Sequence, residues 1–411
     1  MIGELDSQNR IFNIKHKPLY AAGLMILFWA IFDGIGTYSL PILMTENGLT
    51  KTAVGLIIGS SSIAGCFFDY LLGRFLKNPH YRRIYLAMLA LCLIYPLILL
   101  NAKTLVFFLI AMLVWGVYYD LFGFGNFDFV SRKLPSNEHA SGFGIIWVFR
   151  CLGYTIAPII AGAVIGELVE WKPFGMMWLF LGFAILFYFL LLYLSAKDKK
   201  EYFENLERKP KPSKYEFRNV FKISKLIMPV LICTVLVNIF DAFYWTIGPL
   251  VAQDLKIIHP LDGLFIALYT LPTLLLGWFV GKVANHLGKK RTAYIAFLIG
   301  SIIVSTYALV QSTILLLGLV FISSCFFAIA WPSLNGVYSD FISESSHLEK
   351  EIESLEDFFT NIGYIVGPAL AGFAADKFGN IPAFSYLGIA GIVISLILLK
   401  VTPRSIKITV S

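Results

Sequence analysis

The sequence predicts an all-α polytopic membrane protein, with twelve transmembrane helices arranged as two pseudo-symmetric six-helix bundles. Three observations support this fold class. The chain of 411 residues is 58% hydrophobic and 14% charged, whereas soluble domains carry about 25% charged residues. Apolar runs of about 20 residues, the length that crosses a bilayer as a helix, recur along the whole chain. The second half also repeats the plan of the first half.

The repeat is visible in three pairs of segments. Within each pair the two segments share residue types, and the pairs keep a nearly constant distance along the chain. Such a constant offset indicates a duplicated unit. The pairs begin at Ile31 and Ile239, at Gly73 and Gly281, and at Gly153 and Gly363, with offsets of 208, 208 and 210 residues.

A charged, proline-containing stretch between Ser195 and Lys225 separates the two halves. The sequence on either side of it is strongly apolar, so we interpret the stretch as a linker on the cytoplasmic side. The predicted division is an N-terminal bundle over 1–195, a cytoplasmic linker over 196–225 and a C-terminal bundle over 226–411.

Six spans are predicted in the first half. The polar N-terminus gives way near Lys17 to an apolar run of about 25 residues, which is too long for the core of a signal peptide. We therefore interpret it as a retained first span. The later apolar runs are also interpreted as helices, because in hydrocarbon each backbone polar group needs a partner within its own segment. The spans are 19–44, 53–76, 82–100, 104–131, 140–166 and 173–195.

Six further spans are predicted in the second half, where short polar or basic loops again separate apolar runs. The two Ile-Phe-Asp tripeptides of the repeat fall in the first span of each half, which supports the alignment of the halves. The spans are 226–252, 261–284, 290–310, 313–340, 354–375 and 382–400.

Lysine and arginine predict the orientation, because cytoplasmic loops of membrane proteins carry an excess of these residues. With both termini in the cytoplasm, the outer loops hold only a few of the 33 basic residues. We therefore expect a multi-pass protein of the cell membrane (plasma or inner membrane) with both termini cytoplasmic. The basic residues of the outer loops are Lys51, Lys103, Lys172, Lys256 and Lys377.

Composition and motifs argue against several function classes. The net charge of +7 comes largely from basic residues in loops, so it does not indicate nucleic-acid binding. The five cysteines lie inside predicted spans without a Cys-x-x-Cys pair, and the six histidines lie in or near loops, so no metal site is expected. The chain has no nucleophile elbow and no Walker A motif, so no enzyme is predicted.

The loop between the eighth and ninth spans resembles a motif of the major facilitator superfamily, Gly-xxx-Asp-Arg-x-Gly-Arg-Arg. In the family this loop is thought to latch the two halves on the cytoplasmic side through charge pairs. Asparagine takes the acidic position here, and lysine takes it in the first-half copy, so neither copy supplies the carboxylate of the family's charge pairs. The candidate gating residues are Gly73, Arg82, Arg83, Gly281, Asn285, Gly288, Lys289 and Arg291.

The fifth span resembles the antiporter motif of the same superfamily, Gly-x8-Gly-xxx-Gly-Pro-xx-Gly-Gly, with two glycines replaced by alanine. Small residues let helix backbones approach closely, so the motif predicts tight helix packing. The eleventh span carries a copy, and the motif is therefore either a mark of antiport or a packing element of both halves. Its residues are Gly144, Gly153, Pro158, Gly162, Gly363, Gly367, Pro368 and Gly372.

Two six-helix halves joined by a long loop are also the plan of this superfamily. The resemblance implies substrate binding between the halves, near the middle of the membrane, and transport by rocking one half against the other. We expect a proton gradient to supply the energy and no cofactor to be needed; coupling to sodium stays open as an alternative, because carboxylates also bind sodium.

Four ionisable residues fall in the middle of predicted spans, where a charge is costly and marks a functional candidate. Asp33 and Asp241 occupy equivalent positions in the first and seventh spans, and Asp120 lies in the fourth. A desolvated carboxyl group can carry protons at physiological pH, so we predict proton coupling by these three acids. Arg150 lies in the fifth span at a depth similar to that of Asp120. The two form either a static ion pair or a pair that exchanges partners during transport.

Polar and aromatic residues share helix faces with Asp33 and Asp241, which indicates faces that point at a cavity. An aromatic packing stripe is the alternative interpretation. Three acids and one arginine give the predicted cavity a net charge of −2, which favours an amphipathic cation held also by cation–π contacts. The candidate substrate-binding residues are Asp33, Arg150, Asn238, Asp241, Tyr244, Trp245, Trp331, Asn335 and Asn361.

We therefore predict a proton-coupled secondary transporter that exports small amphipathic or cationic compounds, as a monomer in the lipid bilayer. Two alternatives stay open. One is a proton-coupled importer of a small nutrient or organic anion, whose anionic group would meet Arg150. The other, from a different class, is a membrane receptor or scaffold on the same fold. No nucleic-acid partner is expected.

Overall fold

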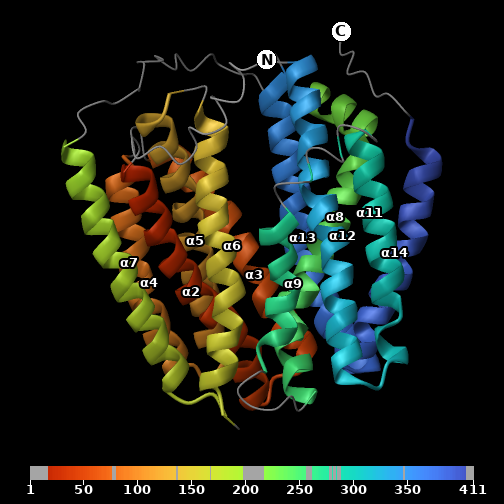
Figure 1. The fold of residues 1–411 in the computed structure, drawn as a ribbon, viewed down its shortest axis with the longest axis horizontal. Coiled ribbons are helices and arrows are strands. Elements are labelled where there is room, and N and C mark those ends of the chain that lie inside the picture. Colours follow the sequence, from red (N-terminus) through yellow and green to blue (C-terminus); the bar gives the residue numbers. More distant parts are fainter. Residues whose placement is uncertain are drawn as a thin grey trace, which may run out of the picture.

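Twelve α-helices account for nearly all of the residues that the structure describes (Figure 1). A short 3-10 helix, Tyr307–Leu309, follows one of them. The structure is a computed structural model, and it describes residues 17–75, 80–135, 138–166, 168–197, 217–255, 262–276, 280, 284, 288–345 and 348–403.

The helices of the first half agree with the predicted spans to within a few residues at each end. This agreement follows from the apolar runs themselves, since a chain in hydrocarbon satisfies its backbone groups as a helix. The six helices are α2 (Lys17–Glu46), α3 (Lys51–Phe75), α4 (Tyr81–Leu100), α5 (Leu105–Lys133), α6 (His139–Val164) and α7 (Lys172–Lys197).

The helices of the second half agree less closely at their ends. Helix α8 begins at Phe217, inside the stretch predicted to be linker. Hydropathy marks only the part of a helix that lies in hydrocarbon, and a helix can continue beyond it into water. The six helices are α8 (Phe217–Asp254), α9 (Leu264–Leu276), α11 (Lys289–Ser305), α12 (Thr313–Glu344), α13 (Glu349–Phe378) and α14 (Asn380–Val401).

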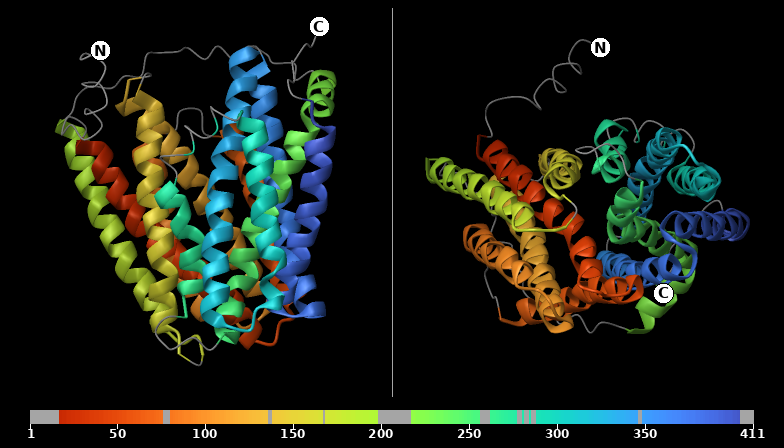
Figure 2. Two further views of the ribbon diagram at one scale, coloured as in Figure 1. Left: turned by 45° about the vertical axis from the view of Figure 1, so that its right-hand side comes forward. Right: turned by 90° about the horizontal axis from the view of Figure 1, so that it is seen from below.

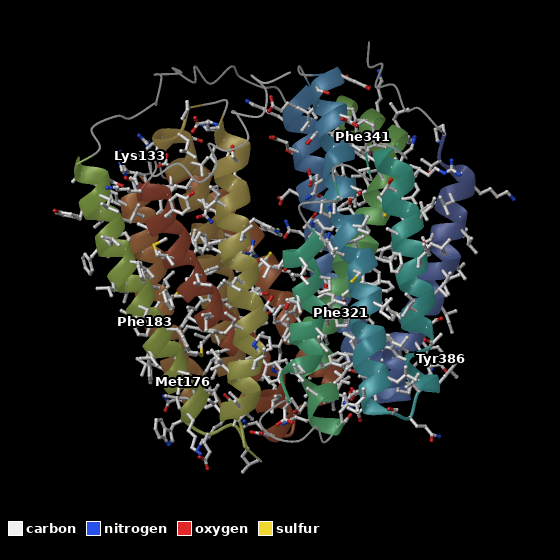
Figure 3. The ribbon with its side chains drawn as sticks, viewed as in Figure 1. Lys133, Met176, Phe183, Phe321, Phe341 and Tyr386 are labelled. Carbon is white, nitrogen blue, oxygen red and sulfur yellow. The ribbon has the colours of Figure 1, made fainter. Side chains whose placement is uncertain are left out.

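Among the described residues, eleven helices are long and apolar enough to cross a membrane, and α9 is a shorter apolar helix. The outer flanks of the molecule carry exposed apolar side chains, such as Phe183 on α7 and Tyr386 on α14 (Figure 3). Apolar side chains on the outside are expected where lipid rather than water surrounds the helices. The chain is therefore a multi-pass membrane protein.

The helices run between two ends of the molecule. We call the end at which α2 and α8 begin and α7 and α14 end the linker face, and the other end the opposite face (Figures 1 and 2). The turn from α2 to α3 lies at the opposite face, as do the turns from α6 to α7 and from α13 to α14. Seen along the helices, the two halves lie side by side (Figure 2).

The two halves share one packing plan. In the first half, α2 packs against α6 and α7, and α4 packs against α5; in the second half, α8 packs against α13 and α14, and α11 packs against α12. These pairs are equivalent under the sequence repeat, so the duplication extends to the packing of the helices.

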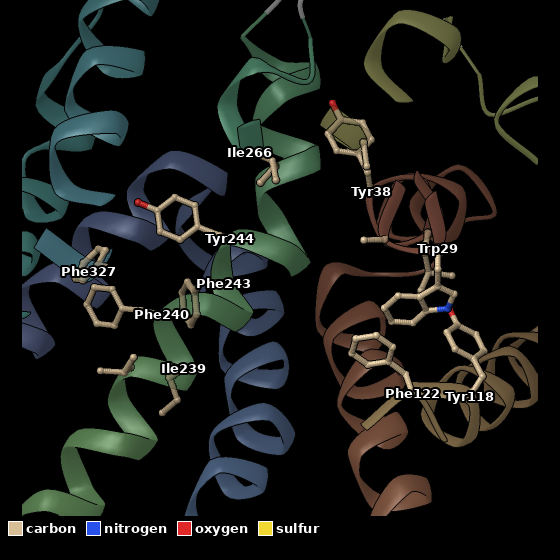
Figure 4. Packing of buried hydrophobic residues seen from close by; sticks show 14 of the residues in the cluster. Trp29, Tyr38, Tyr118, Phe122, Ile239, Phe240, Phe243, Tyr244, Ile266 and Phe327 are labelled. Atoms are coloured by element: carbon tan, nitrogen blue, oxygen red, sulfur yellow. The ribbon is translucent and has the colours of Figure 1, made fainter. Parts of the chain in front are cut away.

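Each half has its own aromatic core (Figure 4). In the first half, Trp29 of α2 stacks on Phe122 of α5 with ring centroids 4.1 Å apart. In the second half, Phe240 of α8 packs against Phe327 of α12, with centroids 5.2 Å apart. The helices that carry the sequence repeat, α2 and α8, are thus anchored by aromatic packing within their own halves.

Glycine and proline form two equivalent contacts between the halves. A Cβ at Gly55 of α3 would lie 1.9 Å from the carbonyl oxygen of Pro368 in α13, and a Cβ at Gly263, just before α9, would lie 1.8 Å from that of Pro158 in α6. Both positions therefore require glycine for the halves to meet. Gly55 and Gly263 are 208 residues apart, so the two contacts are related by the repeat.

Asp376 of α13 also binds the start of α3 across the halves. Its carboxylate accepts hydrogen bonds from the backbone N–H groups of Lys51 and Thr52, at 3.1 and 2.8 Å, and from the Thr52 hydroxyl at 2.7 Å. A carboxylate at a helix N-terminus satisfies free N–H groups and meets the positive end of the helix dipole. The halves are thus held together at the opposite face.

Candidate functional site

The carboxyl group of Asp33 lies inside the first half, in the middle of α2, with only 1% of the residue exposed. Its Oδ1 accepts a hydrogen bond from the Tyr118 hydroxyl at 2.5 Å and another from the Trp115 indole N–H at 3.0 Å. Its Oδ2 accepts one from the Tyr154 hydroxyl at 2.6 Å. Helices α5 and α6 supply these donors, and all three are neutral side chains.

The carboxyl group of Asp241 occupies the equivalent place on α8 and is partly exposed. The Tyr269 hydroxyl of α9 donates to its Oδ1 at 2.5 Å, and the Tyr364 hydroxyl of α13 donates to its Oδ2 at 2.9 Å. The Trp245 indole also lies near enough to interact with this carboxyl group, which is more accessible than its counterpart in the first half.

Tyr154 and Tyr364 are equivalent residues of the glycine–proline motif. Each follows the first motif glycine of its half, Gly153 or Gly363. A Cβ at Gly153 would lie 2.6 Å from Cβ of Ala30 in α2, and a Cβ at Gly363 would lie 2.5 Å from Cβ of Asn238 in α8. Each glycine thus lets its helix approach the aspartate-bearing helix, which brings the next residue, tyrosine, to the carboxyl group.

Arg150 of α6 lies among aromatic rings. Its guanidinium donates a hydrogen bond to the Tyr119 hydroxyl. The guanidinium carbon is 5.1 to 5.4 Å from the ring centroids of Tyr119, Phe122, Trp147 and Tyr154, within the range of cation–π attraction. Arg150 is also close enough to Asp33 and Asp241 to interact electrostatically with both.

Arg150 and the two carboxyl groups are linked to a contact between the halves. Tyr154, which binds Asp33, packs its ring edge-on against Trp245 of α8, with centroids 5.6 Å apart. One residue along α6, the Thr155 hydroxyl is 3.2 Å from that of Thr270 in α9. A movement of one half relative to the other would therefore change the surroundings of all three charges.

The predicted pair of Arg150 with Asp120 is not formed in this structure. The contacts of Arg150 in the described part of the chain are aromatic, whereas Asp120 faces α3. A Cβ at Gly65 of α3 would lie 2.7 Å from its Oδ2. Arg150 and Asp120 lie at a similar depth, but the Asp120 side chain points away from Arg150. Tyr119, which contacts Arg150, and Asp120 are adjacent on α5, so their side chains point about 100° apart around the helix axis.

The structure places the other predicted lining residues in different surroundings. Asn238 is 2% exposed and donates to the Thr234 carbonyl at 2.8 Å; Tyr244 is fully buried, with its hydroxyl 2.8 Å from that of Tyr307. Their contacts belong to the packing of the second half, which corrects the prediction that both line a cavity. Their spacing from Asp241 predicted that Asn238 and Tyr244 share one face of α8 with it. In the structure, that face of α8 packs largely against α9, α13 and α14.

Trp245 is the predicted lining residue that reaches the other half. Trp331 is partly buried, Asn335 is exposed, and Asn361 donates to the Asp357 carbonyl at 3.1 Å. None of the hydrogen bonds described for these three residues goes to Asp33 or Asp241.

Part of the predicted gating loop lies outside the described residues, including Gly281 and Asn285. Gly288 has a φ of +85°, which favours glycine, and precedes α11. Lys289 forms an ion pair with Asp340 of α12 at 2.5 Å. This contact lies within the second half, so it joins the loop to its own bundle. Arg291 is exposed.

The first-half copy of that loop is described from His80 onward, and Gly73 falls in α3. The backbone carbonyl of Arg82 accepts a hydrogen bond from Tyr188 of α7 at 2.7 Å. Arg83 is exposed. These contacts too lie within one half.

The packing motif makes two kinds of contact. Gly153, Gly363 and Gly367 lie against α2 or α8 of their own half, whereas Gly162 and Gly372 lie against the start of α9 and of α3 in the other half. Gly144 differs from the prediction, because no described atom lies within 4 Å of a Cβ placed there. It is exposed, near the linker face, where α6 has no close neighbour at this position.

The aromatic partners on α5 are candidate site residues that the sequence analysis did not identify. Trp115, Tyr118, Tyr119 and Phe122 recur at spacings of three and four residues, which places them on one helix face. The sequence carries this spacing, but charge within a span was the criterion for a candidate residue, and on α5 it selects the neighbouring acid, Asp120. In the described part of the chain, no cluster of three or more His, Cys, Asp or Glu side chains could hold a metal ion.

Comparison with known proteins identifies a family. The sequence profile of the Major Facilitator Superfamily matches residues 21–240 and 230–410. A 160-residue segment is 27% identical to the quinolone resistance protein NorA of Staphylococcus aureus, over 38% of this chain and 40% of that protein. The match thus spans well under two thirds of the relative's length.

Solved structures share the fold at low sequence identity. The nucleoside transporter NupG is 14% identical with a TM-score of 0.75, over 95% of this chain and all of that one. A peptide transporter, POT, is 15% identical with a TM-score of 0.71, over 94% of both chains. The human organic anion transporter TETRAN is 16% identical with a TM-score of 0.65, over 94% and 99%.

Proposed function

The chain belongs to the Major Facilitator Superfamily, and on that premise we propose that it is a proton-coupled exporter of amphipathic cations that works by alternating access. The observation that carries the proposal is the pair of equivalent carboxyl groups, Asp33 on α2 and Asp241 on α8. Each accepts hydrogen bonds from neutral donors only. Neither carboxyl group forms a salt bridge with a residue of the described chain.

The charges of the site favour exchange of a cation for a proton. Asp33 and Asp241 when ionised, together with Arg150, give a net charge of −1. This replaces the −2 expected from the sequence, because Asp120 lies apart against α3. A site of charge −1 becomes neutral when it binds either one proton or one monovalent cation. Desolvated charge is costly, so the two ligands compete.

The two carboxyl groups differ in ways that suggest different roles. Asp241 is partly exposed and has two donors, so a cation can approach it directly. Asp33 is covered by Trp115, Tyr118 and Tyr154. We assign the cation contact to Asp241 and a proton-coupling role to Asp33.

Tyr154 connects Asp33 to the contact between the halves. A protonated carboxyl carries an O–H donor in place of one acceptor site, and Tyr154 is the one described donor to Oδ2. A proton that binds Oδ2 at the lone pair that now accepts from Tyr154 would displace the Tyr154 hydroxyl. Because the Tyr154 ring packs against Trp245 of the other half, a movement of Tyr154 changes the contact between the halves.

The contacts between the halves support alternating access. Those of Gly55, Gly263 and Asp376 lie at the opposite face. With both termini in the cytoplasm, as the basic loops predict, this conformation is closed toward the outside. Transport then requires these contacts to break while new ones form at the linker face.

Export is supported by the similarity to a quinolone resistance protein over part of the chain. The proposed setting is a cell membrane, where the monomer uses a proton gradient and no cofactor. Import of an organic anion is the second candidate function. The observation that favours it is Arg150, whose guanidinium is hydrogen-bonded to a neutral hydroxyl rather than a carboxylate.

The proposal is tested by proton flux in liposomes that contain the purified protein and a pH-sensitive dye. A lipophilic quaternary ammonium, added across a pH gradient, is expected to drive proton movement. Asp241→Asn and Asp33→Asn should each lower this flux about tenfold or more, since each removes a charge-assisted interaction. Glu349→Gln, at an exposed acid on α13, should leave it unchanged.

A folded Asp241→Asn protein with undiminished cation-driven proton flux would rule out the assigned role. Flux driven by organic anions but by none of the cations would favour the importer.

A further inference from the structure

Arg150 has hydrogen-bonding capacity that its described neighbours do not use. The guanidinium carries five N–H donors and keeps its charge in proteins. Its described hydrogen bond goes to the neutral Tyr119 hydroxyl, and no carboxylate of the described chain lies within ion-pair distance of it. A charged group in such surroundings is stabilised by an anion, and the cation–π contacts of four rings replace an anion only in part.

The position of Arg150 makes it accessible to a ligand. The side chain is partly exposed, and Trp147, one turn nearer the linker face on α6, is 47% exposed. The described close contacts of Gly55, Gly263 and Asp376 between the halves lie at the opposite face. A ligand that enters between the halves from the linker face therefore meets Trp147 and then Arg150.

The charged groups near Arg150 restrict which anion can bind. Asp33 and Asp241 act on it electrostatically, and the phenol groups around it are Tyr119, Tyr154 and Tyr364. A ligand with only a negative charge is repelled by two ionised carboxylates. A ligand that also carries a cationic nitrogen satisfies Asp241 and Arg150 together.

We propose that the substrate is an amphoteric aromatic compound whose ammonium group binds Asp241 and whose carboxylate binds Arg150. The planar guanidinium matches the two oxygens of a carboxylate. The aromatic part of the ligand packs on the exposed ring of Trp147. This inference rests on the proposed exchange at Asp241, where the ammonium group of the ligand takes the place of a proton. It changes the substrate class from a simple cation to a compound that also carries a carboxylate, whose charge Arg150 balances.

Three naphthyl compounds that differ only in charge test the assignment: naphthylalanine carries both charges, naphthylethylamine only the positive one, and naphthylpropionate only the negative one. Their binding to the purified full-length protein is measured by thermal stabilisation and by equilibrium dialysis at neutral pH. Naphthylalanine should bind about tenfold or more tightly than naphthylethylamine, because charge-assisted hydrogen bonds are the stronger class. Naphthylpropionate should bind most weakly.

Arg150→Gln should bring the affinities for naphthylalanine and naphthylethylamine to within about threefold of each other, since it removes the carboxylate partner and keeps the ammonium partner. Arg150→Lys keeps the positive charge but loses the planar guanidinium that can bind both carboxylate oxygens. It should reduce the preference for naphthylalanine in part. Lys350→Gln, at an exposed lysine of α13, is the control for loss of a positive charge and should keep the full preference.

An unchanged preference in Arg150→Gln would overturn the inference; if that variant does not fold, an unchanged preference in Arg150→Lys would do so. No preference in the wild-type protein would also overturn it. Binding and coupling are separable here. Arg150-dependent preference without any proton flux in liposomes would contradict the proposed exporter and leave the carboxylate site standing.

Discussion

At the residue scale, two aspartates with one sequence context have different surroundings. Asp33 accepts three hydrogen bonds and is covered, whereas Asp241 accepts two and is partly exposed. In each, the donor to Oδ2 is the tyrosine of the glycine–proline motif. The duplicated unit is thus a carboxyl group on one helix and a tyrosine on the helix that packs against it.

Loss of either motif tyrosine hydroxyl should impair transport. Tyr154→Phe and Tyr364→Phe each leave one carboxylate oxygen without its described donor, and a hydrogen bond to a charged group contributes about 1.5–3 kcal/mol. We expect cation-driven proton flux to fall about tenfold in each variant. Liposome flux with the pH-sensitive dye measures this.

Tyr244→Phe is the matched control for these variants. It removes a buried hydroxyl of the second half that bonds Tyr307 rather than a carboxylate. Flux in Tyr244→Phe should stay within about twofold of wild type, because the lost hydrogen bond joins two neutral hydroxyls and the ring that stacks on Tyr269 is retained. Equal losses in all three variants would mean that the hydroxyls act only through stability.

At the element scale, α6 and α13 each serve both halves. Near the middle of the membrane they approach α2 and α8 of their own half through Gly153 and Gly363, and nearer the opposite face they meet α9 and α3 of the other half. A helix with two such contacts transmits a change at the carboxyl group to the interface. Asp376 adds a polar contact at the end of α13.

Gly55→Ala should shift the protein away from the conformation described here. Its Cβ would overlap the backbone carbonyl of Pro368, and a change of rotamer cannot relieve such a clash. Overpacking of this kind costs about 1–3 kcal/mol, which would reduce the closed population at the opposite face by roughly fivefold to 150-fold. Spin labels are attached to cysteines introduced at positions 172 and 377 in a protein that lacks the five native cysteines. In Gly55→Ala the distance between the two labels should lengthen.

Gly182→Ala provides the control, since no described atom lies within 4 Å of a Cβ there. The distance distribution in this variant should match wild type. If Gly55→Ala also matches wild type, the contact with Pro368 does not hold the opposite face closed.

The sequence predicted the elements better than the site. Apolar length alone located the helices, and an aspartate within an apolar run marked α2 and α8 as the helices of a candidate site. The partners could not be predicted, because they depend on how each helix is rotated against its neighbour. Tyr119 and Asp120 are adjacent in sequence, yet one meets Arg150 and the other meets α3.

At the scale of the whole molecule, two copies of one bundle bring two carboxyl groups and a single arginine together where they meet. The copies are equivalent in packing but not in charge, since Arg150 has no arginine counterpart in α13, where the equivalent position is Thr360. The site therefore carries one positive charge and two acids. That asymmetry gives the site a net charge that one proton or one cation neutralises.

Proton release on cation binding tests this account most directly. Purified protein in weakly buffered detergent is titrated with a naphthyl quaternary ammonium, which itself cannot release a proton, and bound cation and pH are measured together. We expect up to about one proton released per cation bound when the carboxyl groups start protonated, since the two ligands share one site. Release should fall toward zero in Asp241→Asn. Saturable binding in the wild-type protein with no proton released, or with equal release in Asp241→Asn, would contradict the account.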